Sequence, residues 1–373
     1  MTGNFFYYER CRKGDRTFRF DILKKIKNWD YALVPDAVPE NNRILSIDIL
    51  RFFAIFLVTG FHIARYFSYD LHDILQVFLQ AFKIGGGMGC ALFFVIAGYC
   101  AELSYTKGKN TYFSFWKKKI KKIIVSYYVA ILFWIIAVKS GIAVKSIDFW
   151  DILTHCTFTH NLFSSTMYSI SGVFWFLGTL VDFYILFPFI TGITKKHPRV
   201  SFLSSIIICV FAMILENVLG QPVNLHRSIF IYLPCFVAGM LLFNKRLFMR
   251  RGNLLLILIS LSTIFFIEPG YVNKIFFNLP LYYVCISILL SVGVTNLEVN
   301  LNRGLQSTNW ISYIAQRSFS IYLYNYIFCA VKPVNHSSFV FIVLYIFTFC
   351  FGFLMYDFIE KKAIRLKGIK FHT

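Results

Sequence analysis

Ten long apolar stretches constrain what this 373-residue chain can fold into. A helix needs about 20 apolar residues to cross a hydrocarbon core of about 30 Å, and the stretches after residue 43 approach that length. They cover residues 44–67, 78–103, 123–138, 173–193, 202–219, 228–243, 254–267, 275–294, 311–331 and 339–359. The sequence therefore predicts an all-α, polytopic integral membrane protein with about ten transmembrane helices.

The composition excludes an ordinary soluble enzyme. Hydrophobic residues make up 57% of the chain and charged residues only 15%, whereas soluble domains have about 45–50% and about 25%. The net charge of +20 would suggest nucleic acid as a partner if it lay on a soluble domain. In a membrane protein, the positions of the Lys and Arg residues decide its meaning.

The basic residues predict how the chain crosses the membrane. With the N-terminus inside, 29 of the 38 Lys and Arg residues fall in inside segments, five fall in outside loops, and four lie within or beside spans. Cytoplasmic loops carry such an excess of positive charge. We therefore expect both termini to be cytoplasmic and expect no binding of nucleic acid.

Three regions follow from this topology. Residues 1–43 form a basic, cytoplasmic N-terminal arm, in which Lys24, Lys25 and Lys27 beside Phe20 and Leu23 suit a helix lying on an anionic membrane surface. Residues 44–360 form the transmembrane domain. Residues 361–373 form a cytoplasmic tail.

The first span contains three ionisable residues, Asp48, Arg51 and His62. Each Asp or Arg in hydrocarbon costs about 2.5–3.5 kcal/mol on insertion scales, so such groups usually face a protein interior or an aqueous pathway. Asp48 can pair with Arg51 one turn later. Arg51 and His62 lie roughly 20° apart around the helix and about 16 Å apart along it. Two interpretations stay open: an interfacial ion pair with a core histidine, or an anion-binding arginine with a histidine that moves protons.

The cysteines and the remaining histidines give no clear metal site. Nine cysteines are scattered singly without a CxxC pair, as is typical of small apolar packing residues. His155, Cys156 and His160 have weak spacing for a metal and lack a carboxylate. We expect no bound metal.

Several segments resemble one family in the same order. The first span contains IDILRFFAIFLVTGFH, with Arg51 and His62, and the second contains MGCALFFVIAGYCAEL. The later segments are FSFWKKKIKKIIVSYY, FWFLGTLVDFYILFP, SFSIYLYNYIF and YDFIEKK. Together they resemble the membrane acyltransferase family 3, the OafA/WecH-type O-acyltransferases, over residues 43–362.

The chain departs from the family pattern at several positions. Lysines stand where arginines are usual before the third span, and Ala97 replaces a serine. Leu180 and Val181 occupy positions where glutamate is frequent, so that Asp182 is the nearest carboxylate. Asn325 stands where histidine is common. No SGNH domain follows the tenth span, so we expect the stand-alone form.

The resemblance implies transfer of an acyl group, usually acetyl, from acetyl-CoA to a hydroxyl of an envelope polysaccharide such as O-antigen, or of a lipid-linked sugar, at the bacterial inner membrane. His62 would act as general base or transient acyl carrier, with Arg51 and Asp48 as its catalytic partners. Residues expected to bind CoA are Arg51, Lys119, Lys122, Phe93, Phe94, Gly98 and Tyr99. Residues expected to bind the acceptor are Trp175, Asp182, Tyr184, Tyr322 and Asn325.

Other interpretations remain open at this point. Positive-inside topology alone predicts basic residues between 107 and 122. Gly85, Gly86, Gly87 and Gly89 suit either an unwound helix at a cavity or ordinary helix packing. A transporter of an anionic solute or a lipid-linked glycan would also contain intramembrane Arg and His residues.

Overall fold

The computed structural model describes residues 44–65, 74–106, 111–141, 146–219, 225–244, 252–266, 279–300, 309–327 and 338–362. Within these residues the chain forms helices and turns and no β-strand. The predicted arm over residues 1–43 and the predicted tail beyond residue 362 lie outside the described residues.

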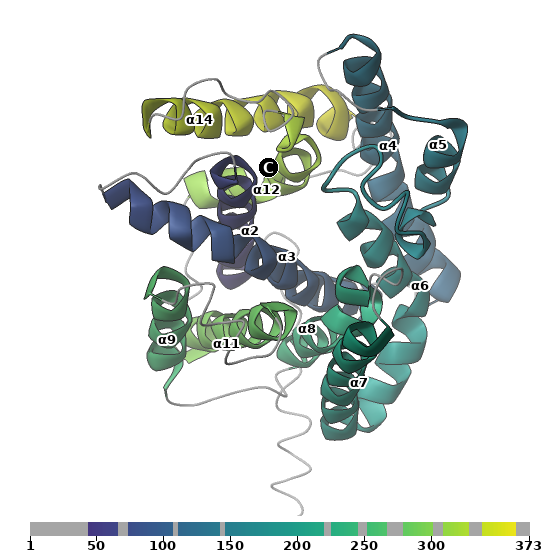
Figure 1. Ribbon diagram of the computed structural model, residues 1–373. Coiled ribbons are helices and arrows are strands. Elements are labelled where there is room, and N and C mark those ends of the chain that lie inside the picture. Colours follow the sequence, from purple (N-terminus) through teal and green to yellow (C-terminus); the bar gives the residue numbers. More distant parts are fainter. Residues whose placement is uncertain are drawn as a thin grey trace, which may run out of the picture. The chain divides into compact units, whose positions relative to one another are not determined.

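Each of the ten predicted spans falls on a helix (Figure 1). The helices are α2 (Leu45–Ala64), α3 (Ile74–Thr106), α4 (Tyr112–Lys139), α6 (Trp175–Lys196), α7 (Pro198–Leu219), α8 (Ile229–Phe243), α9 (Asn253–Phe266), α11 (Leu279–Asn300), α12 (Asn309–Tyr324) and α14 (Ser338–Met355). In the described part of the chain, eight helical segments are long and apolar enough to cross a membrane. The segments on α9 and α12 do not reach that length. The protein is thus an all-α polytopic membrane protein.

Helix α4 begins well before the apolar stretch predicted at residue 123. No glycine or proline interrupts residues 112–122, and lysine favours helix, so the helix continues through the basic segment. Lys117 and Lys119 consequently lie on a helix and not in a connecting loop. This places their side chains at fixed positions relative to the neighbouring helices.

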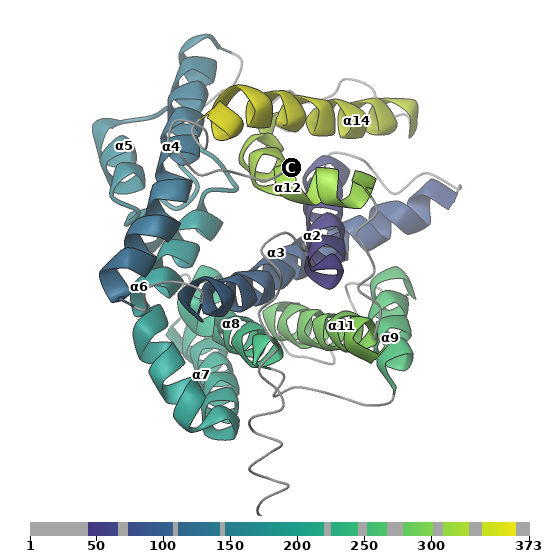
Figure 2. The same cartoon turned by 180° about the vertical axis from the view of Figure 1, so that it is seen from behind.

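Helix α3 occupies the centre of the packing. It contacts α2, α8 and α11 extensively (Figures 1 and 2). Its approach to α8 depends on glycine, because a Cβ at Gly98 would collide with the main-chain oxygen of Phe236, and one at Gly239 with that of Val95. Small residues allow such close backbone contact between membrane helices.

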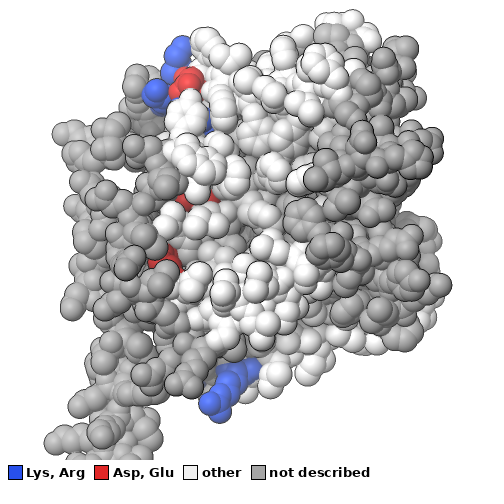
Figure 3. Space-filling view, turned by 90° about the vertical axis from the view of Figure 1, so that its left-hand side faces the viewer, with Lys and Arg blue, Asp and Glu red and all other residues white. Residues whose placement is uncertain are grey.

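Helices α7 and α14 are the most peripheral of the spanning helices. Only 22% of the apolar window of each is buried inside the protein. On α7, the exposed side chains include Leu203, Ile207, Phe211, Ile214 and Val218, which recur at helical spacing. Figure 3 shows another side of the molecule, the left-hand side of Figure 1, where the described surface is also mostly uncharged. Such surfaces suit contact with lipid.

Candidate functional site

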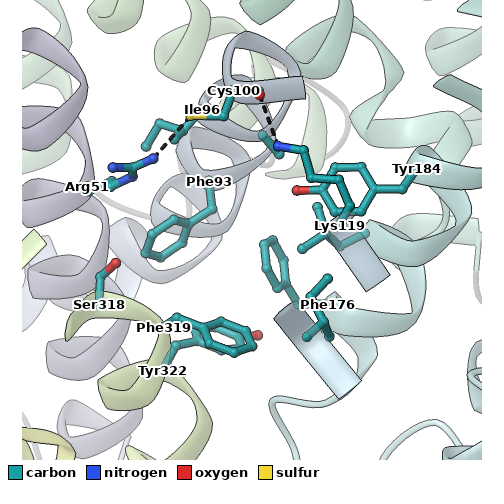
Figure 4. Close-up of a pocket in the computed structure, with 13 residues that line it drawn as sticks. Arg51, Phe93, Ile96, Cys100, Lys119, Phe176, Tyr184, Ser318, Phe319 and Tyr322 are labelled. Atoms are coloured by element: carbon teal, nitrogen blue, oxygen red, sulfur yellow. Dashed lines mark hydrogen bonds between the residues drawn. The ribbon is translucent and has the colours of Figure 1, made fainter. Parts of the chain in front are cut away.

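Five helices, α2, α3, α4, α6 and α12, line a cavity of about 250 Å³ (Figure 4). Its polar lining consists of Arg51, Cys100, Lys119, Tyr184, Ser318 and Tyr322. The cavity is smaller than typical ligand pockets of roughly 300–1,000 Å³. It has room for one arm of a larger molecule.

Arg51 is held at the cavity by contacts on two sides. Its Nη1 lies 3.4 Å from Oδ1 of Asp48, and its Nη2 donates to Sγ of Cys100 at 3.1 Å. Asp48 is itself fixed, because Ser312 Oγ donates to its Oδ2 at 2.8 Å. The Asp48 side chain is buried, whereas 31% of the Arg51 side chain is exposed. The ion pair therefore orients Arg51 and leaves part of its guanidinium accessible.

Lys119 approaches Cys100 from the other side (Figure 4). Its Nζ donates to the main-chain oxygen of Cys100 at 2.9 Å and lies 5.5 Å from the centre of the Tyr184 ring. Two cations from different helices thus line one cavity, to which no described carboxylate contributes lining. Such an arrangement favours an anionic ligand.

A carboxylate from α11 fixes the start of α2. Oε1 of Glu298 accepts from the main-chain N–H of Leu45 at 3.1 Å, and Oε2 accepts from that of Ser46 at 3.1 Å. The residue before the helix, Ile44, provides no side-chain cap. Since the first N–H groups of a helix have no partner within it, Glu298 stabilises the turn that carries Asp48.

Three aromatic side chains contact one another along one side of the cavity. The ring centres of Phe93 and Phe176 are 6.0 Å apart, and those of Phe176 and Tyr322 are 5.0 Å apart. The hydroxyl of Tyr322 donates to the main-chain oxygen of Val173 at 2.7 Å. We call Phe93, Phe176 and Tyr322 the aromatic wall.

His62 does not line this cavity. It lies in the last turn of α2, about 16 Å along the helix axis from Arg51. Its side chain is buried, and its ring meets that of Tyr326 edge-on at 5.4 Å. Its Nδ1 has no hydrogen-bond partner within the part of the chain that the structure describes. Sequence reasoning places Arg51 and His62 on one helix face, and the structure places them at two separate sites along that face.

Most of the predicted CoA motif on α3 points away from the cavity. Phe93 lines it, whereas Phe94 packs in the core against Tyr232, with ring centres 4.6 Å apart. Gly98 contacts α8, and the Tyr99 ring meets Phe243. Lys122 is another predicted CoA contact, and its side chain is not among those that the structure describes.

The predicted acceptor residues also divide into two groups. Tyr184 and Tyr322 line the cavity. Trp175 is buried beside Tyr232, Asn325 is fully buried, and Asp182 is partly buried on α6. The last three do not contribute to the cavity lining.

Sequence reasoning missed Cys100, which accepts a hydrogen bond from each cation. It counted Cys100 among the packing cysteines, although Cys100 lies seven residues after Phe93 and so on the same helix face. The seven-residue spacing from Phe93 could therefore have identified Cys100 as a candidate lining residue. Ser318 and Phe319 on α12 also line the cavity, and no local pattern distinguishes them from other residues of that span.

The segment between α4 and α6 contains a buried histidine pair. It includes the helix α5 (Phe149–Cys156) and the 3₁₀ turn η1 (His160–Leu162). The rings of His155 and His160 stack with centres 4.2 Å apart, and His160 Nε2 lies 3.0 Å from the main-chain oxygen of Phe174. Burial lowers the pKa of His160 to about 4. Among the described residues no group of three metal-ligating side chains converges, and both rings pack within the buried interior.

Comparison with known proteins adds to this geometry. The family model of the acyltransferase domain matches residues 44–359. A protein of Caenorhabditis elegans named "Regulator of hypoxia-inducible factor 1" is 26% identical over 184 residues, which cover 43% of this chain and 36% of the nematode protein. No solved structure matches the chain. Because the family model spans well over half of the residues, including the helices that line the cavity, the chain belongs to the membrane acyltransferase family 3.

Proposed function

We propose that the protein transfers an acyl group, in the first place acetyl, from cytoplasmic acyl-CoA to a hydroxyl of an envelope polysaccharide or a lipid-linked sugar. The family supports acyltransferase activity in general. The observation that carries the finer proposal is the cavity with Arg51 and Lys119 on either side of Cys100. We place the protein in a bacterial inner membrane, with Arg51 near the cytoplasmic side.

The donor fits the chemistry of the cavity. CoA carries phosphate groups, for which an arginine fork and a lysine point charge are both suitable partners. The cavity of about 250 Å³ has room for a narrow arm rather than for a whole nucleotide. The phosphates then bind at Arg51 and Lys119, and the pantetheine arm extends toward the aromatic wall.

His62 supplies the proton transfer. Its Nδ1, which has no hydrogen-bond partner among the described residues, can accept the proton of the acceptor hydroxyl, and general base catalysis of this kind contributes roughly 10²- to 10⁴-fold. A transiently acylated His62 is the alternative route to the same product. Asp48 acts through Arg51, which it orients, and does not itself touch the donor.

The test uses membrane vesicles with the cytoplasmic face outward and acetyl-CoA labelled in the acetyl group. Wild-type vesicles should transfer label to envelope glycan and release free CoA thiol. His62→Ala should abolish transfer with normal membrane insertion. Full transfer by His62→Ala would overturn the role of His62, and absence of transfer by the wild type with any acyl-CoA would overturn the proposed function.

Matched variants separate donor binding from topology. Lys119→Ala should raise KM for acyl-CoA by about tenfold or more, because a hydrogen bond to a charged group contributes about 1.5–3 kcal/mol. Lys117 lies on the same helix, is exposed and does not line the cavity, so Lys117→Ala should leave KM unchanged. Equal effects of both variants would assign the lysines to general electrostatics.

A further inference from the structure

A second group of polar side chains surrounds Arg227, which ends the 3₁₀ turn η2 (Leu225–Arg227) just before α8. The Arg227 guanidinium lies 4.5 Å from the centre of the Trp175 ring and is hydrogen-bonded to the Tyr168 side chain. The main-chain oxygen of Arg227 accepts from Thr179 Oγ1 at 2.7 Å. Side chain and main chain are thus both fixed against α6 and the segment before it.

Arg227 and His62 both have unused bonding capacity. Among the described residues, neither the buried Nε of Arg227 nor the buried Nδ1 of His62 has a hydrogen-bond partner. Within the described ranges no Asp or Glu forms an ion pair with Arg227. Buried polar groups are usually paired. The His62 ring meets that of Tyr326 at 5.4 Å, and Tyr326 also packs against Gly172, three residues before Trp175. Two buried atoms with unused bonding capacity in this region indicate a site that a further polar group completes.

The Arg227 site adjoins the cavity across the aromatic wall. Tyr322 packs against Phe176, with ring centres 5.0 Å apart, and Phe176 packs against Trp175, with ring centres 6.1 Å apart. Phe176 of the wall directly follows Trp175, on which Arg227 rests. Trp175 therefore lies between Arg227 and the aromatic wall, and Arg227 is the partly buried cation that Trp175 contacts behind that wall.

We propose that Arg227 is a catalytic residue of the acyl transfer, whose guanidinium donates to the acyl oxygen of the donor as negative charge develops there. This inference rests on the proposed function and assigns a role to a residue that sequence reasoning counted only as a loop cation. Preorganised donors aimed at a developing oxyanion are typically worth 10²- to 10³-fold in kcat.

The step balances with the groups present. The hydroxyl oxygen of the acceptor forms a bond to the acyl carbon, and its proton moves to Nδ1 of His62. The electron pair of the carbonyl π bond moves to the acyl oxygen, where Arg227 pairs with it. Collapse re-forms the carbonyl and breaks the C–S bond, and CoA leaves as a thiolate that takes the proton from His62.

The experiment compares Arg227→Met with Arg65→Met in the vesicle assay. Arg65 lies three residues after His62, but it is exposed and lies over the Phe61 ring. We expect Arg227→Met to lower kcat by about 10²- to 10³-fold with KM for acyl-CoA unchanged, and Arg65→Met to stay close to the wild type. A low, non-denaturing concentration of guanidinium should partly restore kcat in Arg227→Ala.

Other results would overturn the inference. Equal losses in Arg227→Met and Arg65→Met would show a general effect of charge on His62. A raised KM for the acceptor with kcat unchanged would make Arg227 an acceptor-binding residue. If the Met variant fails to fold, Arg227→Gln replaces it, and wild-type kcat in Arg227→Gln would refute the need for a charged donor. An inactive wild type would refute the proposed function itself, which is a distinct outcome.

Discussion

Glu298 gives the sharpest test of how the fold positions Arg51. Its two carboxylate oxygens accept from the N–H groups of Leu45 and Ser46, both at 3.1 Å. In Glu298→Gln the side chain keeps one oxygen acceptor but loses its charge and one of the two hydrogen bonds. The first turn of α2, which leads into Asp48 and Arg51, should then open more often.

The magnitude follows from these contacts. Loss of a helix cap costs about 0.5–2 kcal/mol, and a negative charge at a helix N-terminus contributes about 0.3–1 kcal/mol. We therefore expect the free energy of local opening at the start of α2 to fall by about 1–2 kcal/mol. Because 1.4 kcal/mol is about tenfold, amide exchange at Leu45 and Ser46 should accelerate about 5- to 30-fold.

Hydrogen exchange with mass spectrometry in detergent measures this change. Glu216→Gln is the matched control, because Glu216 is also partly buried but pairs with His226 on another helix, at 2.7 Å. Only Glu298→Gln should accelerate exchange at the start of α2 and raise KM for acyl-CoA. Unchanged exchange at Leu45 and Ser46 in Glu298→Gln would refute the capping argument.

Three further predictions concern the stability of the fold in detergent. Gly98→Ala should lower Tm markedly and separate α3 from α8, because its Cβ would collide with the main chain of α8; a wild-type Tm would contradict the close approach. Lys195→Met should lower the free energy of unfolding by roughly 1–3 kcal/mol, because it removes the half-exposed cation 2.8 Å from the fully buried Glu102 carboxylate and leaves that carboxylate the hydrogen bond from Thr191; adding Glu102→Gln should recover most of the loss. Burial lowers the pKa of His160 to about 4, below the unfolded value of 6.5. The unfolded state therefore binds more protons below about pH 6.5, and stability should fall by up to about 3 kcal/mol as the pH drops toward 4; His160→Gln should lose this dependence, as Tm against pH would show.

The sequence predicted the helices well because apolar length is a local property. Each predicted span falls on a helix. The start of α4 differs from the prediction because the helix includes the lysines before residue 123, whereas the apolar stretch begins only after them. Arg51, Lys119, Tyr184 and Tyr322 were also predicted as site residues and line the cavity. Cations and tyrosines within apolar helices can be recognised as candidate site residues from the sequence alone, before the packing of the helices is known.

The remaining parts of the site depend on contacts that no local pattern encodes. Phe93 and Phe94 are adjacent, and successive side chains on a helix point about 100° apart, so one lines the cavity while the other fills the core. Glu298 caps a helix more than 250 residues away in the sequence. The sequence assigned it only to a loop between spans, because its partner is set by how α11 packs beside α2.

Under the proposed reaction, the separation of Arg51 and His62 along α2 divides two tasks that a thioester donor requires. Phosphate binding needs a cation that stays hydrated on one side, and Arg51 keeps part of its side chain exposed. Proton transfer and oxyanion stabilisation need groups shielded from water, where electrostatic interactions are stronger, and His62 is buried. A rise of about 1.5 Å per residue over eleven residues fixes the separation at about 16 Å. Under the proposed reaction, the donor's pantetheine arm must therefore span the distance from Arg51 to His62. Shortening that arm should abolish transfer while binding at Arg51 persists.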